Sequence, residues 1–219
     1  MAKENAQQRQ ALEGAVASTF FRYLLTSMTG LIAMTSASLV DGIFIGNYVG
    51  VTALAAVNLI IPIMALSFGV AIMVGVGSSV RGGKYLGEND VTAASSIFSK
   101  TLSFMVFYGL IAVGTALLFE RKLFVLLGAG EELFPVMSDY YRVVTPFLFA
   151  QFITIVLYFF VRLDGMPSLA AFSLALGALV NIFLDYLFIA QYGWGLKGAA
   201  LATGLSELCS MIILLSYFF

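Results

Sequence analysis

Long uncharged runs of apolar residues are the feature that most limits what this chain can fold into. Asp41 is the only charged residue between Tyr23 and Val80, and residues 101–119 carry no charge at all. A helix needs about 20 residues to cross the hydrocarbon layer of a membrane, so the first run is long enough for two crossings. Because 61% of the residues are hydrophobic and 11% are charged, against about 25% charged residues in soluble domains, we predict an integral membrane protein.

Turn-forming and charged segments divide the apolar sequence into six predicted membrane-spanning helices. Gly46–Gly50 interrupts the first run, and Arg81–Asp90 is charged, rich in glycine and predicted to be a loop. Pro62 is expected to kink the second helix. The predicted fold is an all-α bundle of six transmembrane helices, with residues 1–15 as a cytoplasmic lead-in and residues 16–219 as the membrane domain. The helices are expected at about residues 17–47, 52–79, 91–119, 136–161, 168–191 and 198–219.

The distribution of basic residues favours one orientation in the membrane. A cytoplasmic N-terminus places seven of the eleven basic residues in the cytoplasm and four outside, in agreement with the positive-inside rule. We therefore expect a multi-pass protein of the plasma membrane (the inner membrane in a bacterium) with a cytoplasmic N-terminus. The last residues, Ser216–Phe219, have no polar flank, so we expect the sequence to stop at or inside the sixth helix, as part of something longer.

Several function classes are disfavoured by the composition. The chain has no histidine and a single cysteine, Cys209, so the commonest general base and metal ligand is missing and no set of nucleophile and base can be assembled. Neither an enzymatic activity nor a cofactor is predicted. The net charge is −1 without a basic cluster, which gives no reason to expect a nucleic-acid partner.

Polar residues inside the predicted helices indicate a site for a cation or a proton. Asp185 is the only charged residue between Asp164 and Lys197, and a carboxylate within a membrane is costly unless it faces other helices, water or a cation. Asn181 lies four residues earlier, on the same helical face. Thr203 and Glu207 have the same spacing on the next helix. Oxygen ligands of this kind suit hard cations such as sodium.

The sequence around Asp41 resembles the sequence around Asp185. At an offset of 144 residues, six of eighteen positions are identical between DGIFIGNYVGVTALAAVN and DYLFIAQYGWGLKGAALA. Each aspartate comes about seven residues before a tyrosine of an outer loop, so both carboxylates are expected at a similar depth, roughly 10 Å below that loop. Parallel internal repeats of this kind are found in secondary transporters.

Six segments of the sequence form a recognisable set: Leu39–Asn58, Arg81–Asp90, Leu127–Glu132, Tyr141–Arg142, Asn181–Asp185 and Gly198–Thr203. Together they resemble the motifs of the multidrug and toxic compound extrusion (MATE) transporters. The resemblance implies the N-terminal six-helix lobe of a twelve-helix transporter, which exchanges sodium or protons for amphipathic organic cations. It places the cation or proton site at Asp41, Asn181, Asp185 and Thr203, which would ligate Na⁺ if coupling is to sodium. The lobe then needs a C-terminal lobe of the same protein or a second copy as its partner.

Other interpretations stay open. Asn58, Gln151 and Glu207 are candidates for a substrate cavity, although Glu207 is not part of the family pattern. Asn181 and Thr203 could equally form ordinary hydrogen bonds between helices. A flippase for lipids or lipid-linked oligosaccharides would need basic residues in its cavity to bind phosphate. A six-helix scaffold or small channel would not be stabilised by sodium, acid or a lipophilic cation.

Overall fold

The fold is a bundle of helices in which six stretches can cross a membrane. The structure is a computed structural model that describes residues 2–218, with side chains from Val16 onward except those of Thr19 and Arg22. Within these residues all regular secondary structure is helical, and six helical stretches are long and apolar enough to span a bilayer, as predicted. They cover Val16–Val49, Val51–Gly87, Val91–Leu118, Glu131–Leu163, Pro167–Gln191 and Gly195–Phe218.

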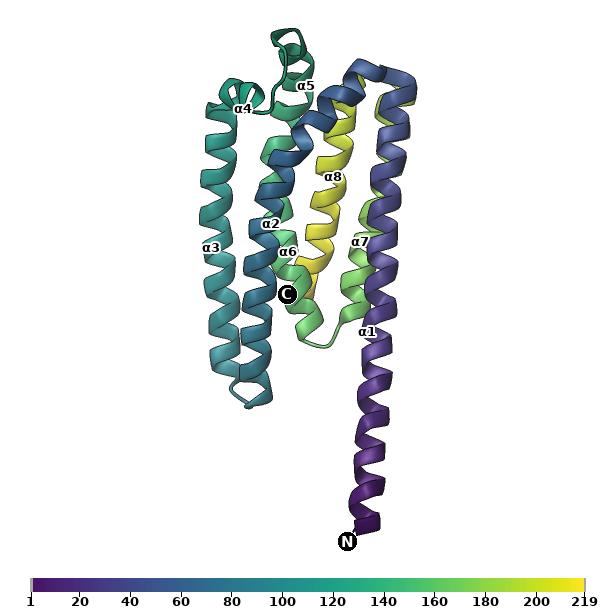
Figure 1. Cartoon of the computed structure of the whole chain (residues 1–219), viewed down its shortest axis with the longest axis vertical. Helices are drawn as coiled ribbons and strands as arrows, with labels where there is room; N and C mark the ends of the chain where they lie inside the picture. The colour runs from purple at the N-terminus through teal and green to yellow at the C-terminus, as the bar shows by residue number, and fades with distance from the viewer. Residues whose placement is uncertain (1, 219) are drawn as a thin grey trace.

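The helices run up and down the bundle (Figure 1). The N-terminus, the α2–α3 turn and the α6–α7 turn lie at one end, and the α1–α2 and α7–α8 turns lie at the other with α4 and α5. Helix α1 extends beyond the rest of the bundle at its N-terminal end. The elements are α1 (Ala2–Phe44), α2 (Val51–Gly87), α3 (Val91–Leu118), α4 (Glu120–Leu126), α5 (Phe134–Val144), α6 (Leu148–Leu163), α7 (Pro167–Asp185) and α8 (Gly195–Leu215), with short π-helical and 3₁₀ segments between them.

Small residues allow α7 to pack closely against its neighbours. Helix α7 lies between α1 and α8, and Gly177 faces α8 so closely that a Cβ atom there would collide with the Ser210 hydroxyl group. On the other side, a Cβ atom at Gly30 of α1 would lie 3.3 Å from the Leu174 side chain. Such close approach is typical of helix packing in lipid. It places the polar residues of α7 and α8 near one another.

Helix α1 is also held near the α6–α7 turn, at the level of Tyr23 and Ser27. Arg162, near the C-terminus of α6, donates hydrogen bonds from Nη2 to the Ser27 hydroxyl oxygen at 2.7 Å and from Nη1 to the Tyr158 hydroxyl oxygen at 3.0 Å. The Tyr23 hydroxyl group donates to the backbone carbonyl of Arg162 at 3.3 Å. These contacts join the lower part of α1 to α6.

Helix α2 continues through most of the segment that was predicted as a loop. It ends only at Gly87, so residues 81–87 are helical. The reason is that Gly82 and Gly83 do not form a turn but let α2 pack against Leu163 of α6. The actual turn is Glu88–Asp90, and the Asp90 side chain caps α3 by accepting a hydrogen bond from the backbone N–H of Ala93 at 2.9 Å. Pro62 lies inside α2, which bends along its length (Figure 1).

Two other predicted helices are interrupted in the structure. The predicted fourth helix (136–161) consists of α5 and α6, separated by a 3₁₀ turn at Thr145–Phe147. Pro146 in this turn has no backbone N–H and cannot continue the α-helical hydrogen bonding. The predicted fifth helix (168–191) is α-helical only to Asp185 and continues as a π-helix over Tyr186–Gln191. Helix α1 likewise ends in a π-helix, Ile45–Val49.

Candidate functional site

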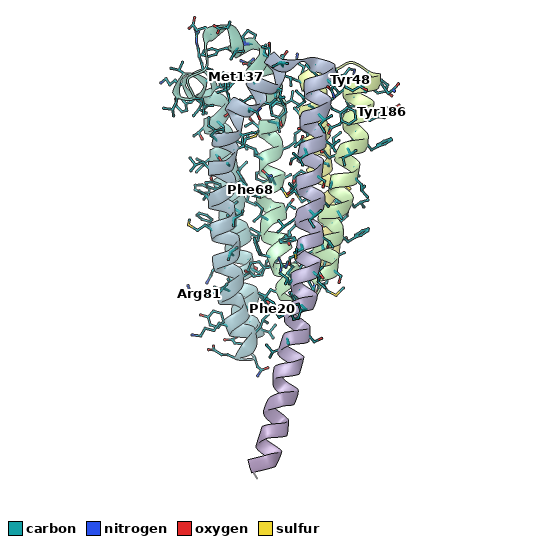
Figure 2. All side chains as sticks on the ribbon, turned by 45° about the vertical axis from the view of Figure 1, so that its right-hand side comes forward. Phe20, Tyr48, Phe68, Arg81, Met137 and Tyr186 are labelled. Carbon is teal, nitrogen blue, oxygen red and sulfur yellow. The ribbon has the colours of Figure 1, made fainter. Side chains whose placement is uncertain are left out.

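Asp41 and Asp185 lie near each other in the upper part of the bundle. Helix α1 packs along α7, and the two carboxylates are close enough for their charges to interact. Asp185 is completely buried and Asp41 is half-buried. Tyr48 and Tyr186, which lie near the two aspartates in the sequence, are both found toward the α1–α2 end of the bundle (Figure 2).

The carboxylate oxygens of these two aspartates have no hydrogen-bond partners. Both oxygens of Asp185 and the Oδ1 atom of Asp41 are buried without a partner, and they are the only such side-chain atoms in the part of the chain whose side chains are described. Most buried polar atoms in proteins are hydrogen-bonded, so buried oxygens without a protein partner are suited to bind a water molecule, an ion or a proton. The three oxygens therefore fit a site that binds a cation or protons.

Tyr140 of α5 joins this pair and was not predicted from the sequence. The residue is 6% exposed, and its hydroxyl group lies near the Thr203 side chain and within electrostatic range of both Asp41 and Asp185. The adjacent Tyr141 is just as buried, but its hydroxyl group donates to the Ala116 carbonyl at 3.3 Å. The local sequence does not distinguish the two tyrosines, because only the packing of α5 against α8 brings Tyr140 to the site.

Four other predicted residues meet in one cavity beside the aspartates. This cavity, which we call the polar cavity, has a volume of about 190 Å³. Asp41 and Asp185 do not line it, but they lie one helical turn from two residues that do, Ser38 and Asn181. Its polar lining residues are Ser38, Gln151, Asn181, Thr203, Ser206, Glu207 and Ser210.

A second cavity adjoins the first and is mostly apolar. This apolar cavity also has a volume of about 190 Å³ and is lined by Leu31, Phe68 and Phe159, among others. Gln151 and Glu207 line both cavities. Figure 2 places Phe68 on α2 at about the middle of the bundle. Asn58, the remaining candidate, is exposed on α2 and is not among the residues that line either cavity.

The oxygen atoms around the two aspartates are of the kind that would suit a monovalent cation or a proton. Among the residues described, no group of three or more His, Cys, Asp or Glu side chains could hold a metal ion. The candidate ligands are the two carboxylates, the Asn181 amide and the hydroxyl groups of Thr203 and Tyr140. Hard cations such as sodium prefer oxygen atoms of this kind.

The backbone after each aspartate departs from a regular α-helix. After α1 the Gly50 N–H donates to the carbonyl of Ile45 at 2.9 Å, and after α7 the Tyr192 N–H donates to the carbonyl of Leu187 at 3.0 Å. Both bonds span five residues, as in a π-helix. Such segments are rare and are often found at functional sites.

The fold and the buried acidic pair define a multi-pass membrane protein with the helical architecture of a transporter lobe. The MatE family model matches residues 26–187, and the chain belongs to this family. It is 26% identical over 205 residues to the multidrug export protein MepA of Staphylococcus aureus (strain MRSA252), covering 93% of this chain and 45% of that protein. It is 25% identical over 202 residues to the probable multidrug resistance protein YoeA of Bacillus subtilis (strain 168), covering 89% and 43%.

Solved structures of this family have the same fold. A crystal structure of MATE in complex with MaD3S superposes with a TM-score of 0.84 at 29% identity, over 89% of this chain and 44% of that one. An outward-facing multidrug resistance MATE transporter superposes with a TM-score of 0.82 at 29% identity, over 89% and 43%. The chain thus corresponds to one six-helix lobe and spans less than half the length of these relatives.

Proposed function

We propose that this chain is the N-terminal lobe of a cation-coupled antiporter that exports amphipathic organic cations. The lobe works with a second six-helix lobe, either of the same protein or of a second copy, in a plasma membrane with the N-terminus in the cytoplasm. Sodium ions or protons bind at Asp41, Asn181, Asp185, Thr203 and Tyr140. The relatives named as multidrug export or resistance proteins support this substrate class.

The three unpaired carboxylate oxygens of Asp41 and Asp185 are the observation that carries the proposal. Two carboxylates that interact inside a membrane repel each other, so the pair is stabilised by a shared proton or by a cation. In either form the site loses net negative charge when it is loaded. The repulsion between α1 and α7 then falls, which favours a different position of α1.

Coupling follows if the drug and the cation favour different conformations of the transporter. A ligand shifts a conformational equilibrium only by the difference between its affinities for the two states. Cation binding at the aspartates would favour the state with low drug affinity, and release of the cation would favour the opposite state. The energy of the cation gradient is thereby used for export.

A flippase for phosphate-containing lipids fits the site less well. Among the residues whose side chains the structure describes, those that line the polar and apolar cavities include one acidic residue, Glu207, and no lysine or arginine. Phosphate groups are bound by arginine, lysine or helix N-termini. An acidic cavity is instead suited to a positively charged substrate.

The test is cation-driven efflux from membrane vesicles that contain the transporter with this lobe. An inward gradient of sodium or protons should drive ethidium export by the wild type; Asp185→Asn should abolish the dependence on the gradient, and Asp41→Asn should weaken it. Asp139→Asn is the matched control, because Asp139 is an exposed aspartate at the same end of the bundle, paired with Lys197 at 3.1 Å. Wild-type coupling in both site variants would contradict the proposal.

A further inference from the structure

Helix α4 lies outside the six membrane-spanning stretches but directly after one of them. It follows α3 at the upper end of the bundle (Figure 1). Its inward face is firmly held, because the buried Glu120 carboxylate accepts hydrogen bonds from Arg142 Nε at 2.7 Å and from the Ser138 hydroxyl group. The buried Phe124 ring packs against the Tyr141 ring at a centroid distance of 5.4 Å. These contacts with α5 fix which face of α4 points away from the protein.

The outward face of α4 carries basic and apolar side chains together. Lys122, Val125 and Leu126 have the i, i+3, i+4 spacing of one helical face, and all three are exposed. The groove beside them, which we call the α4 groove, has a volume of about 620 Å³ and is lined by Leu118, Phe119, Arg121, Lys122 and Val125. This lining holds two positive charges and no acidic side chain. A positively charged groove with apolar walls is suited to an amphipathic anion.

The two basic side chains of the α4 groove are available to such an anion. Within the part of the chain whose side chains are described, Lys122 makes no ion pair with an acidic residue. Its ammonium group lies 5.2 Å from the centre of the Phe119 ring. Arg121 pairs with Glu131 through Nη2 at 2.9 Å, but both side chains are exposed, and exposed ion pairs contribute little to stability. The guanidinium group has further N–H donors, so Arg121 and Lys122 can bind one anionic group together.

Exposed apolar side chains of α3 lead directly to the α4 groove. Phe107, Ile111 and Leu118 are 65%, 49% and 80% exposed, and their spacings of four and seven residues place them on one face of α3. The eleven residues from Phe107 to Leu118 rise by roughly 16 Å, close to half of a hydrocarbon layer of about 30 Å. This apolar row lies within the membrane span of α3. It therefore matches an acyl chain of one leaflet, and the basic residues lie at the end of the row where the phosphate group of the same lipid would be.

We propose that the α4 groove binds an anionic phospholipid of the leaflet on the α4 side of the bundle. The phosphate group lies between Arg121 and Lys122, and one acyl chain runs along α3 from Leu118 towards Phe107. Helix α4 then acts as an interfacial helix that fixes the depth of the bundle in the membrane. The site goes beyond the proposed export function and does not need it. Only its assignment to the outer leaflet rests on the proposed cytoplasmic position of the N-terminus.

The experiment measures lipid retention by native mass spectrometry. The purified chain in detergent is mixed with equal amounts of phosphatidylglycerol and phosphatidylcholine that carry identical acyl chains. The wild type should retain phosphatidylglycerol preferentially, and Lys122→Gln should lower this preference about fivefold, as expected for one basic residue near an anionic lipid. Lys122→Arg should keep the preference. Lys84→Gln is the matched control, because Lys84 is an exposed lysine in the last turn of α2, at the opposite end of the bundle, and it should leave the preference unchanged.

Three outcomes would overturn the proposal. The first is equal retention of the two lipids by the wild type, or an unchanged preference in Lys122→Gln. The second is binding of glycerol 3-phosphate as tightly as phosphatidylglycerol, which would make the groove a site for soluble phosphate esters. The third is a dimer of the chain that loses phosphatidylglycerol on assembly, which would mean that a second copy covers the groove. None of these outcomes affects cation coupling at Asp41 and Asp185, which the efflux measurement tests separately.

Discussion

Two helical hairpins of the molecule share the same arrangement: one is formed by α1 and α2, the other by α7 and α8. The spacing of 144 residues that separates Asp41 from Asp185 also separates Val51 from Gly195, the first residues of α2 and α8. In both hairpins a π-helical segment follows the aspartate. Ile45 and Ile189, which correspond at this spacing, are both buried in the same apolar cluster.

The two hairpins differ in how firmly they are packed. Helix α7 is packed on two sides, by α1 and by α8, whereas α1 packs mainly against α7. Accordingly Asp185 is fully buried with two unpaired oxygens, and Asp41 is half-buried with one. Helix α7 is therefore the more firmly packed side of the aspartate pair, and α1 is the more loosely packed side.

The largest effect is expected from Asp185→Asn. If the buried aspartate is the principal ligand, this variant should lose all stabilisation by sodium or acid. Binding at 100 times the dissociation constant stabilises the folded state by about 2.7 kcal/mol. Thermal unfolding of the purified chain measures this, with NaCl titrated against KCl at fixed pH and pH varied at fixed salt. Retention of the wild-type response would show that Asp185 does not bind the cation.

A glycine substitution tests the difference in packing directly. Gly177→Ala should destabilise the chain by about 2 kcal/mol, because the added methyl group collides with Ser210 of α8 and overpacking has costs of this size. Gly42→Ala is the counterpart on α1, where the nearest atom would be 4.0 Å from the new Cβ. It should be neutral or slightly stabilising, since alanine favours helix by about 0.5–1 kcal/mol. Equal destabilisation in reversible unfolding would contradict the assignment of α1 as the loosely packed helix.

Asp41→Asn should have a smaller effect on ion binding than Asp185→Asn. We expect about a tenfold loss of affinity for the cation, equivalent to about 1.4 kcal/mol. The loss is smaller because only one oxygen of Asp41 is buried without a partner and the residue is half-buried. The same salt and pH titrations measure it. A loss equal to that of Asp185→Asn would mean that the two hairpins contribute equally to the site.

The smallest effect is expected from Tyr140→Phe. Removing one hydroxyl group should weaken cation binding about fivefold, in line with roughly 1 kcal/mol for a hydrogen bond. Tyr141→Phe is the matched control: it removes the hydrogen bond to the Ala116 carbonyl and should lower stability by about 1 kcal/mol without changing cation affinity. Identical responses of the two variants would exclude Tyr140 from the site.

The number of spans could be predicted because apolar length is a local property of the sequence. The helix ends were harder to predict. Gly82 and Gly83 have the composition of a turn, but their role in packing against α6 depends on a contact with Leu163, about 80 residues away. The same limit applies to Tyr140, since its position beside Thr203 results from how α5 packs on α8.

The acidic residues of the candidate site could be located because a carboxylate stands out in an apolar helix. Asn181 and Thr203 were predicted for the cation site and Gln151 and Glu207 for a substrate cavity, and in the structure all four line one cavity. The apolar cavity beside it could not be predicted, because its lining includes Phe68 and Phe159, which come from helices remote in sequence. Asn58 was a candidate for the substrate cavity but is exposed on α2. A polar residue in an apolar helix does not by itself reveal which face of the helix it occupies.

The hydrogen bonds that Arg162 and its backbone carbonyl make with Ser27 and Tyr23 have a geometric consequence for α1. They restrain the helix about fourteen residues before Asp41, a distance of roughly 20 Å at 1.5 Å per residue. A small rotation of α1 about this restrained point therefore displaces the Asp41 carboxylate far more than it displaces the residues next to Ser27. In the proposed antiporter, a cation bound at Asp41 would act on α1 at this distance from the point where the helix is held.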